Sequence, residues 1–191
     1  QISLVRCRSK RIKSRSGRAP QTNPKIDCPN FYFFNYLFFI MQFKSFPNER
    51  QLDIKDSGSA CLKMIAKYYG KYYSLQFFRD KCGVSKDGPS LLDLSYASES
   101  VGLRTLSIFC TANELVTTVP FPCIMHWNRT HYVVVYKVSK TTVYVSDPTK
   151  GLVKYSLAEF DKKWPKNEEG KGTLMTVEPQ ADFKQREINE R

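Results

Sequence analysis

The sequence predicts an α+β domain in which helices come first and a mainly antiparallel sheet follows. Apolar residues recur at helical spacing between residues 59 and 102. Short runs rich in Val and Tyr, separated by turns, then occupy much of residues 104–177. The chain has 191 residues, 41% of them apolar, which is enough to bury one hydrophobic core. This order of elements is typical of helices packed against an antiparallel sheet.

Three helices are predicted in the first part of the pattern. Residues 59–69 carry an apolar face at helical spacing, and Gly70 stands just past their end, where helices often close on glycine. A second, shorter helix is expected at residues 74–81 behind a serine cap. The third helix is expected within residues 90–102, and Asp93 lies three residues after its serine cap, as in a capping box.

Strands dominate the second part. We expect them at residues 104–109, 122–127, 131–138, 142–147, 152–155 and 173–177. A short helical turn is predicted after Thr111, between the first two strands. Ser156 is the expected cap of a last helix, which ends near Trp164.

The two ends of the chain are predicted to lie outside this domain, which spans residues 41–178. Residues 1–40 hold eight Lys or Arg against one Asp, a net charge of +7 out of +12. Their aromatic stretch at residues 31–40 is about half the length that a membrane helix needs. We interpret residues 1–40 as a basic and aromatic extension from an upstream start. A basic arm for nucleic acid or anionic lipid is the alternative, although we do not expect a nucleic-acid partner. Residues 179–191 form a charged tail that we expect to be mobile.

The six cysteines indicate neither a metal site nor a disulfide framework. They include no C-x-x-C pair and no even set within a compact segment. The four in the patterned region have apolar neighbours, as small buried hydrophobic residues do; they are Cys61, Cys82, Cys110 and Cys123. We therefore expect no metal or cofactor, and a reducing, cytoplasmic environment.

One predicted hairpin brings a histidine and a carboxylate together. If its turn centres on Ser139, His131 lies directly opposite Asp147, with their Cβ atoms about 5 Å apart. A turn centred on Lys140 leaves the two as diagonal neighbours on the same face. A carboxylate there would orient the imidazole of a general base, and the alternative is an ordinary surface His-Asp pair. For His126, the other histidine of the chain, the sequence pattern places no carboxylate on the neighbouring strand in this way.

Ser57 is a small polar residue at the start of the first predicted helix, six positions after Gln51. Unpaired backbone N–H groups and the helix dipole favour negative charge at such a position. A thiol gains greatly from that environment because it ionises, whereas a hydroxyl gains little. The position is therefore arranged for a nucleophile that is more acidic than serine.

These residues belong to a larger pattern. Its motifs are, in chain order, Gln51, Asp56-Ser57-Gly58 followed by Ala60-Cys61-Leu62, Pro122 to Trp127, His131 to Val134, and Asp147-Pro148. Together they resemble the cysteine peptidase domain at the amino terminus of bacteriocin-processing ABC exporters. The resemblance runs from about residue 51 to residue 164.

The resemblance implies a papain-like fold that binds double-glycine leader peptides and cleaves after the second glycine. In such a site Gln51 would be an oxyanion-hole donor, His131 the general base and Asp147 its orienting partner. Ser57 would occupy the position of the nucleophile, where the family has Asp-Cys-Gly. The implied partners are a leader peptide and the transmembrane and ATPase parts of an exporter, which would lie beyond residue 191. The implied location is the cytoplasm, at the inner face of the membrane.

Ser57 leaves three interpretations open. It is a deliberate replacement of cysteine, a natural loss that leaves a non-catalytic docking domain, or a working serine nucleophile. In the first two cases leader binding survives while hydrolysis is abolished or strongly impaired. Cys61 is not expected to replace the nucleophile, because it lies one helical turn further on and on the apolar face.

Overall fold

The structure is a computed structural model that describes residues 45–51, 53–83, 88–128 and 131–186. The chain divides into two units, residues 1–44 and 45–191, and all described residues belong to the second. The predictions made for residues 1–40 therefore lie outside the described residues. None of the helices formed by the described residues is long and apolar enough to cross a bilayer.

The helices and strands predicted from the sequence are present, with small shifts at their ends. The helical elements are η1 (Ile54–Asp56), α2 (Ser57–Tyr68), α3 (Leu75–Cys82), α4 (Leu91–Ser100), α5 (Ala112–Thr117) and α6 (Leu157–Lys163). The strands are β1 (Leu103–Cys110), β2 (Cys123–Asn128), β3 (His131–Val138), β4 (Thr142–Asp147), β5 (Gly151–Ser156) and β6 (Gly172–Pro179). The 3-10 turn η1 was not predicted, and α2 follows it directly, beginning at Ser57 two residues before the apolar face predicted for residues 59–69.

The predicted helix caps are confirmed. The side chains of Ser74, Ser90, Thr111 and Ser156 each accept a hydrogen bond from the backbone N–H three residues on. Each of these bonds satisfies a backbone donor that the first turn of a helix leaves unpaired. The capping box between Ser90 and Asp93 is also formed.

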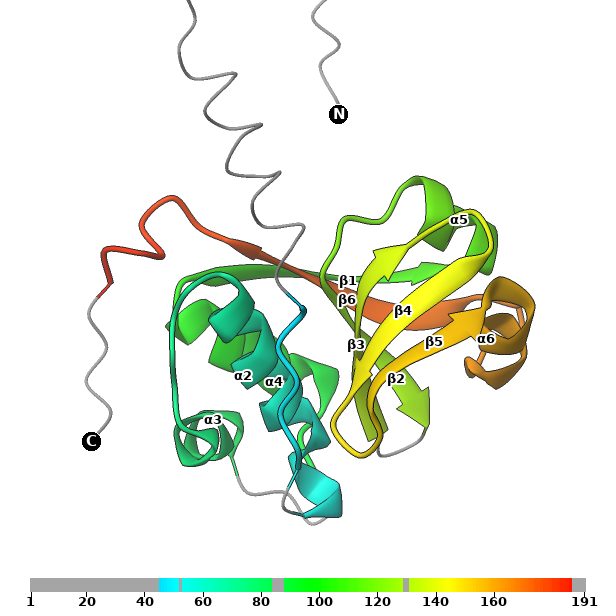
Figure 1. The fold of residues 1–191 in the computed structure, drawn as a ribbon. Helices are drawn as coiled ribbons and strands as arrows, with labels where there is room; N and C mark the ends of the chain where they lie inside the picture. The colour runs from blue at the N-terminus through cyan, green and yellow to red at the C-terminus, as the bar shows by residue number, and fades with distance from the viewer. Residues whose placement is uncertain (1–44, 52, 84–87, 129–130, 187–191) are drawn as a thin grey trace, which may run out of the picture. The chain divides into compact units, whose positions relative to one another are not determined.

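The strands form one antiparallel sheet in the order β1-β6-β2-β3-β4-β5. Figure 1 shows α2, α3 and α4 gathered on one side of it and α5 and α6 on the other. Successive residues of a central strand point to opposite faces of the sheet. Val134 therefore packs with α2, α3 and α4, and Val133 packs with α5 and α6. The predicted α+β class is confirmed.

Helix α2 packs against β3 (Figure 1). Its first residue, Ser57, is hydrogen-bonded to the backbone of that strand. A glycine permits the close approach of α4 at the same end. A Cβ atom on Gly58 would lie 2.8 Å from Cγ of Pro89 and 2.9 Å from Cδ2 of Leu94. The start of α2 is thus fixed by the sheet and by the start of α4.

The packed region extends past residue 178, where the sequence suggested that the domain ends. Phe183 is 1% exposed and belongs to the core between the sheet and the first three helices. Arg186 donates to the Asp182 carboxylate over 2.7 Å. Residues 180–186 therefore belong to the folded domain and not to a mobile tail, while residues 187–191 are outside the described part of the chain.

Candidate active site

His131 and Asp147 form the hydrogen-bonded pair that the hairpin predicted. Nε2 of His131 lies 3.0 Å from Oδ1 of Asp147. Val134 is paired with Ser146, a register that places Asp147 opposite Val133 and diagonal to His131. The prediction that His131 lies directly opposite Asp147 was therefore wrong. The alternative, a register centred on Lys140, is correct at the end of the hairpin that carries these two residues. An irregularity between Val135 and Lys137 shifts the register nearer the turn.

The surroundings of Asp147 hold it in the ionised state. It is 1% exposed, and Oδ1 also accepts hydrogen bonds from N (2.8 Å) and Oγ1 (2.6 Å) of Thr149. Burial by itself raises the pKa of this carboxyl, but the hydrogen bonds from His131 and Thr149 outweigh it and lower the pKa to about 2. An ionised Asp147 accepts a hydrogen bond from Nε2–H of His131, so Nδ1 is the ring nitrogen that can exchange protons with a reacting group.

Ser57 lies at the junction of α2 with β3. It is the first residue of α2 and is 1% exposed. Its Oγ accepts a hydrogen bond over 3.2 Å from the backbone N–H of Tyr132, the residue that follows His131. The nucleophile position is thereby held next to the strand that carries the proposed base, although the two are more than seventy residues apart in sequence.

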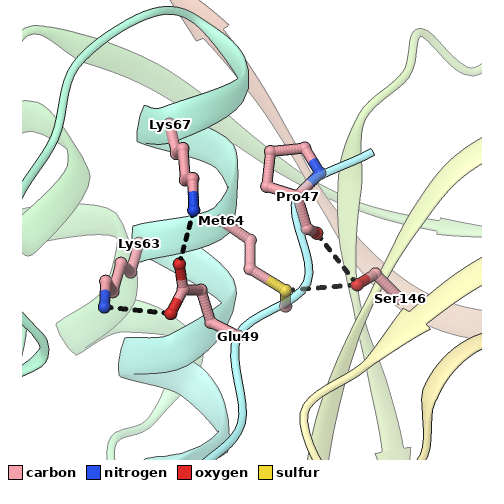
Figure 2. Close-up of polar contacts among 6 residues, drawn as sticks. All are labelled: Pro47, Glu49, Lys63, Met64, Lys67 and Ser146. Carbon is pink, nitrogen blue, oxygen red and sulfur yellow. Dashed lines mark hydrogen bonds and ion pairs between the residues drawn. The ribbon is translucent and has the colours of Figure 1, made fainter. Parts of the chain in front are cut away.

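The segment that leads to Gln51 crosses from the sheet to α2 (Figure 2). Ser146 of β4 donates from Oγ to the carbonyl oxygen of Pro47 over 3.1 Å. Two residues further on, the Glu49 carboxylate bridges two lysines of α2, with Nζ of Lys63 at 3.0 Å and Nζ of Lys67 at 2.8 Å. The segment is therefore tied both to β4 and to α2 before it reaches Gln51.

Gln51 itself is anchored beside Asp147. Its backbone N–H donates to the carbonyl oxygen of Pro148 over 3.1 Å. Its side-chain Oε1 is buried and has no hydrogen-bond partner among the described residues. Buried amide groups are nearly always hydrogen-bonded, so this oxygen is available to a donor, whereas an oxyanion could be bound only by the Nε2 end of the same side chain.

Two residues that the sequence reasoning did not assign to the site lie directly behind it. Asp56 immediately precedes Ser57, and its buried carboxylate accepts hydrogen bonds from the guanidinium of Arg79 in α3. The sequence offered only the Asp56-Ser57-Gly58 motif as a signal. Arg79 lies 23 residues further on, in a separate helix, and no local pattern marks it.

Neither of the competing residues takes over a site role. Cys61 is fully buried in the core, and burial raises the pKa of its thiol well above the ordinary value, with the Asp147 charge adding to the effect. His126 stacks on Tyr132, with ring centroids 5.0 Å apart. Among the expected site residues, His131 is bonded to Asp147 and Ser57 to the backbone next to His131. Gln51 is bonded through its backbone to Pro148, the residue after Asp147.

The model of the peptidase C39 family matches residues 45–181. The lactococcin-G-processing and transport ATP-binding protein of Lactococcus lactis subsp. lactis is 34% identical over 140 residues, which are 70% of this chain and 19% of that protein. The colicin V secretion/processing ATP-binding protein of Escherichia coli is 30% identical over 138 residues, 68% of this chain and 20% of that protein. The chain thus spans about a fifth of the length of these relatives.

Two solved structures share the architecture. The double glycine motif protease of an AMS/PCAT transporter, crystallised with its leader peptide, is 33% identical and has a TM-score of 0.64. The similarity covers 70% of this chain and 91% of that one. The peptidase domain of Streptococcus ComA is 26% identical with a TM-score of 0.63, over 71% of this chain and all of that domain.

Proposed function

Because the chain belongs to the peptidase C39 family, whose members are cysteine peptidases, we propose that it is a leader-peptide-binding domain of a peptide exporter. Its site binds the double glycine of an exported peptide's leader, and hydrolysis is strongly impaired by Ser57. The observation that carries this proposal is the position of Ser57, whose Oγ accepts from the N–H next to His131 while His131 is paired with Asp147. The buried amide of Gln51, whose backbone is bonded to Pro148, supports the assignment of this residue to the same site.

The choice of ligand is supported by the relatives. One solved relative was crystallised in complex with its leader peptide, and it is 33% identical to this chain. The relatives from Lactococcus and Escherichia are processing and transport proteins about five times as long as the matched region. We propose that this domain likewise works with transmembrane and ATPase parts, at the cytoplasmic face of the membrane.

With a cysteine at position 57, the site residues would have the following roles. The thiolate sulfur would bond to the carbonyl carbon of the second glycine, and the amide of Gln51 would donate to the oxyanion. His131 would pass a proton from Nδ1 to the leaving amine, and Asp147 would keep the imidazole oriented. Water, deprotonated by His131, would then release the leader with a free carboxylate.

With serine the first step is the obstacle. The start of α2 and an imidazolium stabilise a thiolate before the substrate arrives, because a thiol has an ordinary pKa of about 8.5. A hydroxyl is far less acidic and must lose its proton to His131 during the attack. Removing the nucleophile of such a set leaves about 10³- to 10⁴-fold catalysis over water. Binding of the leader itself requires no sulfur.

The test compares the chain with its Ser57→Cys variant on a panel of synthetic double-glycine leader peptides, each extended by several residues of cargo. Binding is followed by fluorescence anisotropy and cleavage by mass spectrometry. We expect both proteins to bind with similar affinity, and the variant to cleave after the double glycine at least about 10³ times faster. Adding His131→Ala to the variant should abolish that gain.

Three outcomes decide between the alternatives. Equal cleavage by both proteins would mean that Ser57 is a working nucleophile, contrary to the proposal. If both proteins bind the peptide and neither cleaves it, the domain is a docking domain. In that case its catalytic site lacks a further group besides the cysteine nucleophile. Absence of binding to every peptide would overturn the assignment of leader peptides as ligands.

A further inference from the structure

The carboxylate of Asp56 closes the turn that separates two site positions. Its Oδ2 accepts from the backbone N–H of Asp53 over 2.8 Å, and the backbone N–H of Asp56 donates to the carbonyl oxygen of Asp53 over 3.0 Å. Gln51 precedes this turn and Ser57 follows it. The spacing between the proposed oxyanion donor and the nucleophile position therefore depends on the conformation of the turn.

The same carboxylate puts a buried negative charge beside the nucleophile position. Asp56 is 6% exposed, and it is the residue immediately before Ser57. A negative charge there opposes the formation of a thiolate one residue further on, and so counteracts the start of α2. An uncompensated Asp56 would be a poor neighbour for a cysteine nucleophile.

Arg79 supplies the compensation. Its Nε donates to Oδ1 of Asp56 over 2.7 Å and its Nη2 donates to Oδ2, a two-pronged contact from α3. The Arg79 side chain is 31% exposed, whereas that of Asp56 is 8% exposed. The carboxylate of the pair is therefore buried in the domain, and the guanidinium lies at its surface. The other carboxylates that act on Arg79 are Asp53 and Asp80.

We propose that Arg79 and Asp56 are a positioning pair for the nucleophile position. The carboxylate shapes the turn between Gln51 and Ser57, and the guanidinium cancels the negative charge that the carboxylate would otherwise exert on the nucleophile. The proposal rests on the function proposed above, in which position 57 is built for a cysteine. It assigns to Arg79 a role through Asp56 and no contact with the substrate.

The test uses the full chain with Ser57→Cys as the parent. The rate of alkylation by iodoacetamide at position 57, localised by peptide mass mapping, is measured from pH 4 to pH 10 and reports the pKa of the introduced thiol. Adding Arg79→Gln should raise that pKa by about one unit, because it leaves Asp56 uncompensated. Adding Asp56→Asn should lower it by a similar amount.

The double variant is the matched control. Asp56→Asn with Arg79→Gln removes both charges and should bring the pKa of the thiol back to about that of the parent. His131 and Asp147, the titratable groups on the sheet side of the site, are unchanged throughout the series. If the pair only supported the fold, the pKa of the thiol would not follow the charges of residues 56 and 79, so the double variant would show no such reversal.

Folding of each variant is checked by circular dichroism. If Arg79→Gln does not fold, the Asp56→Asn variant decides, because it carries no uncompensated buried charge. A pKa that stays the same in Asp56→Asn and in Arg79→Gln would overturn the pair's role, while cleavage by the parent would still support the proposed function. Shifted pKa values in a parent that cleaves no leader peptide would support the pair and count against the proposed function.

Discussion

Nε2 of His131 and Oδ1 of Asp147 lie 3.0 Å apart although the two residues are diagonal neighbours and not direct partners in the β3–β4 pairing. The side chains of diagonal residues on one face of a sheet are within reach of each other when one of them is long. The arrangement leaves Asp147 free to accept two further hydrogen bonds from Thr149. A buried carboxylate held by three donors is a fixed orienting group.

The first prediction concerns the pH dependence of stability. The pKa of Asp147 is lowered in the folded protein from 3.8 to about 2, because the hydrogen bonds from His131 and Thr149 outweigh the effect of burial. Its contribution is therefore fully present above about pH 4 and is lost as the pH falls from about 4 to about 2. Over this range the wild-type chain should lose about 2 kcal/mol more free energy of unfolding than Asp147→Asn.

Urea unfolding at a series of pH values between 2 and 5 measures this difference. The control is Asp161→Asn, which removes the partner of Lys166 from a solvent-accessible ion pair and should leave the pH dependence of the wild type nearly unchanged. Parallel curves for the wild type and Asp147→Asn would contradict the prediction.

Cys61 is predicted to be chemically inert in the folded chain. Burial raises the pKa of its thiol well above the ordinary value, so it forms almost no thiolate at neutral pH. In the Ser57→Cys background, adding Cys61→Ala should leave the rate of leader cleavage within about threefold of the parent, at a cost to stability from the cavity. Iodoacetamide labelling of the native chain, read by peptide mapping, should leave Cys61 unmodified, and rapid labelling would refute this.

The bridge from Glu49 to Lys63 and Lys67 is predicted to contribute a small, salt-dependent stability. Its side chains are between 23% and 38% exposed, so Glu49→Gln should lower the free energy of unfolding by only about 0.5–1 kcal/mol at low salt. The loss should shrink in 1 M NaCl, because salt screens partly exposed charges.

Urea unfolding at the two salt concentrations measures the effect. Glu169→Gln is the matched control, because Glu169 is 70% exposed and its ion pair with Lys171 should contribute almost nothing. A loss for Glu49→Gln that is equal at both salt concentrations would show that the segment before Gln51 is held by packing and not by charge.

The local features of this fold could be predicted and its long-range contacts could not. A cap such as Ser90 with Asp93 involves residues three apart, so the sequence itself contains both partners. The pair of Asp56 with Arg79 joins two helices, and nothing near either residue indicates the other. The hairpin register was ambiguous because a one-residue irregularity near Tyr136 leaves no trace in the alternation of apolar residues.

In the candidate site, too, the contact within one hairpin could be predicted and the contact between distant segments could not. His131 and Asp147 could be related through one hairpin, because a short turn connects their strands. The contact of Ser57 with the backbone of Tyr132 spans 75 residues and depends on how α2 packs on the sheet. Motif resemblance grouped these residues without saying how they meet, and the structure supplies the geometry.

The last prediction follows from the part of the chain that the sequence assigned to a tail. Phe183 packs edge-on against Tyr69, with ring centroids 6.3 Å apart, and Nζ of Lys71 lies 5.2 Å from the centre of its ring. Tyr69 in turn donates from its hydroxyl to the carbonyl oxygen of Val177 in β6 over 3.0 Å. Phe183 therefore closes the core where the end of α2 meets the end of β6.

Phe183→Ala should lower the free energy of unfolding by about 3–5 kcal/mol, because it removes a buried ring and leaves a cavity. The matched control is Phe109→Ala, because the ring of Phe109 is 62% exposed and its loss should change stability by no more than about 0.5 kcal/mol.

A chain that ends at residue 186 should unfold at the same urea concentration as the full chain, whereas one that ends at residue 178 should unfold at a much lower one. Equal midpoints for the two truncated chains would show that the domain ends at β6, as charge and composition alone suggest.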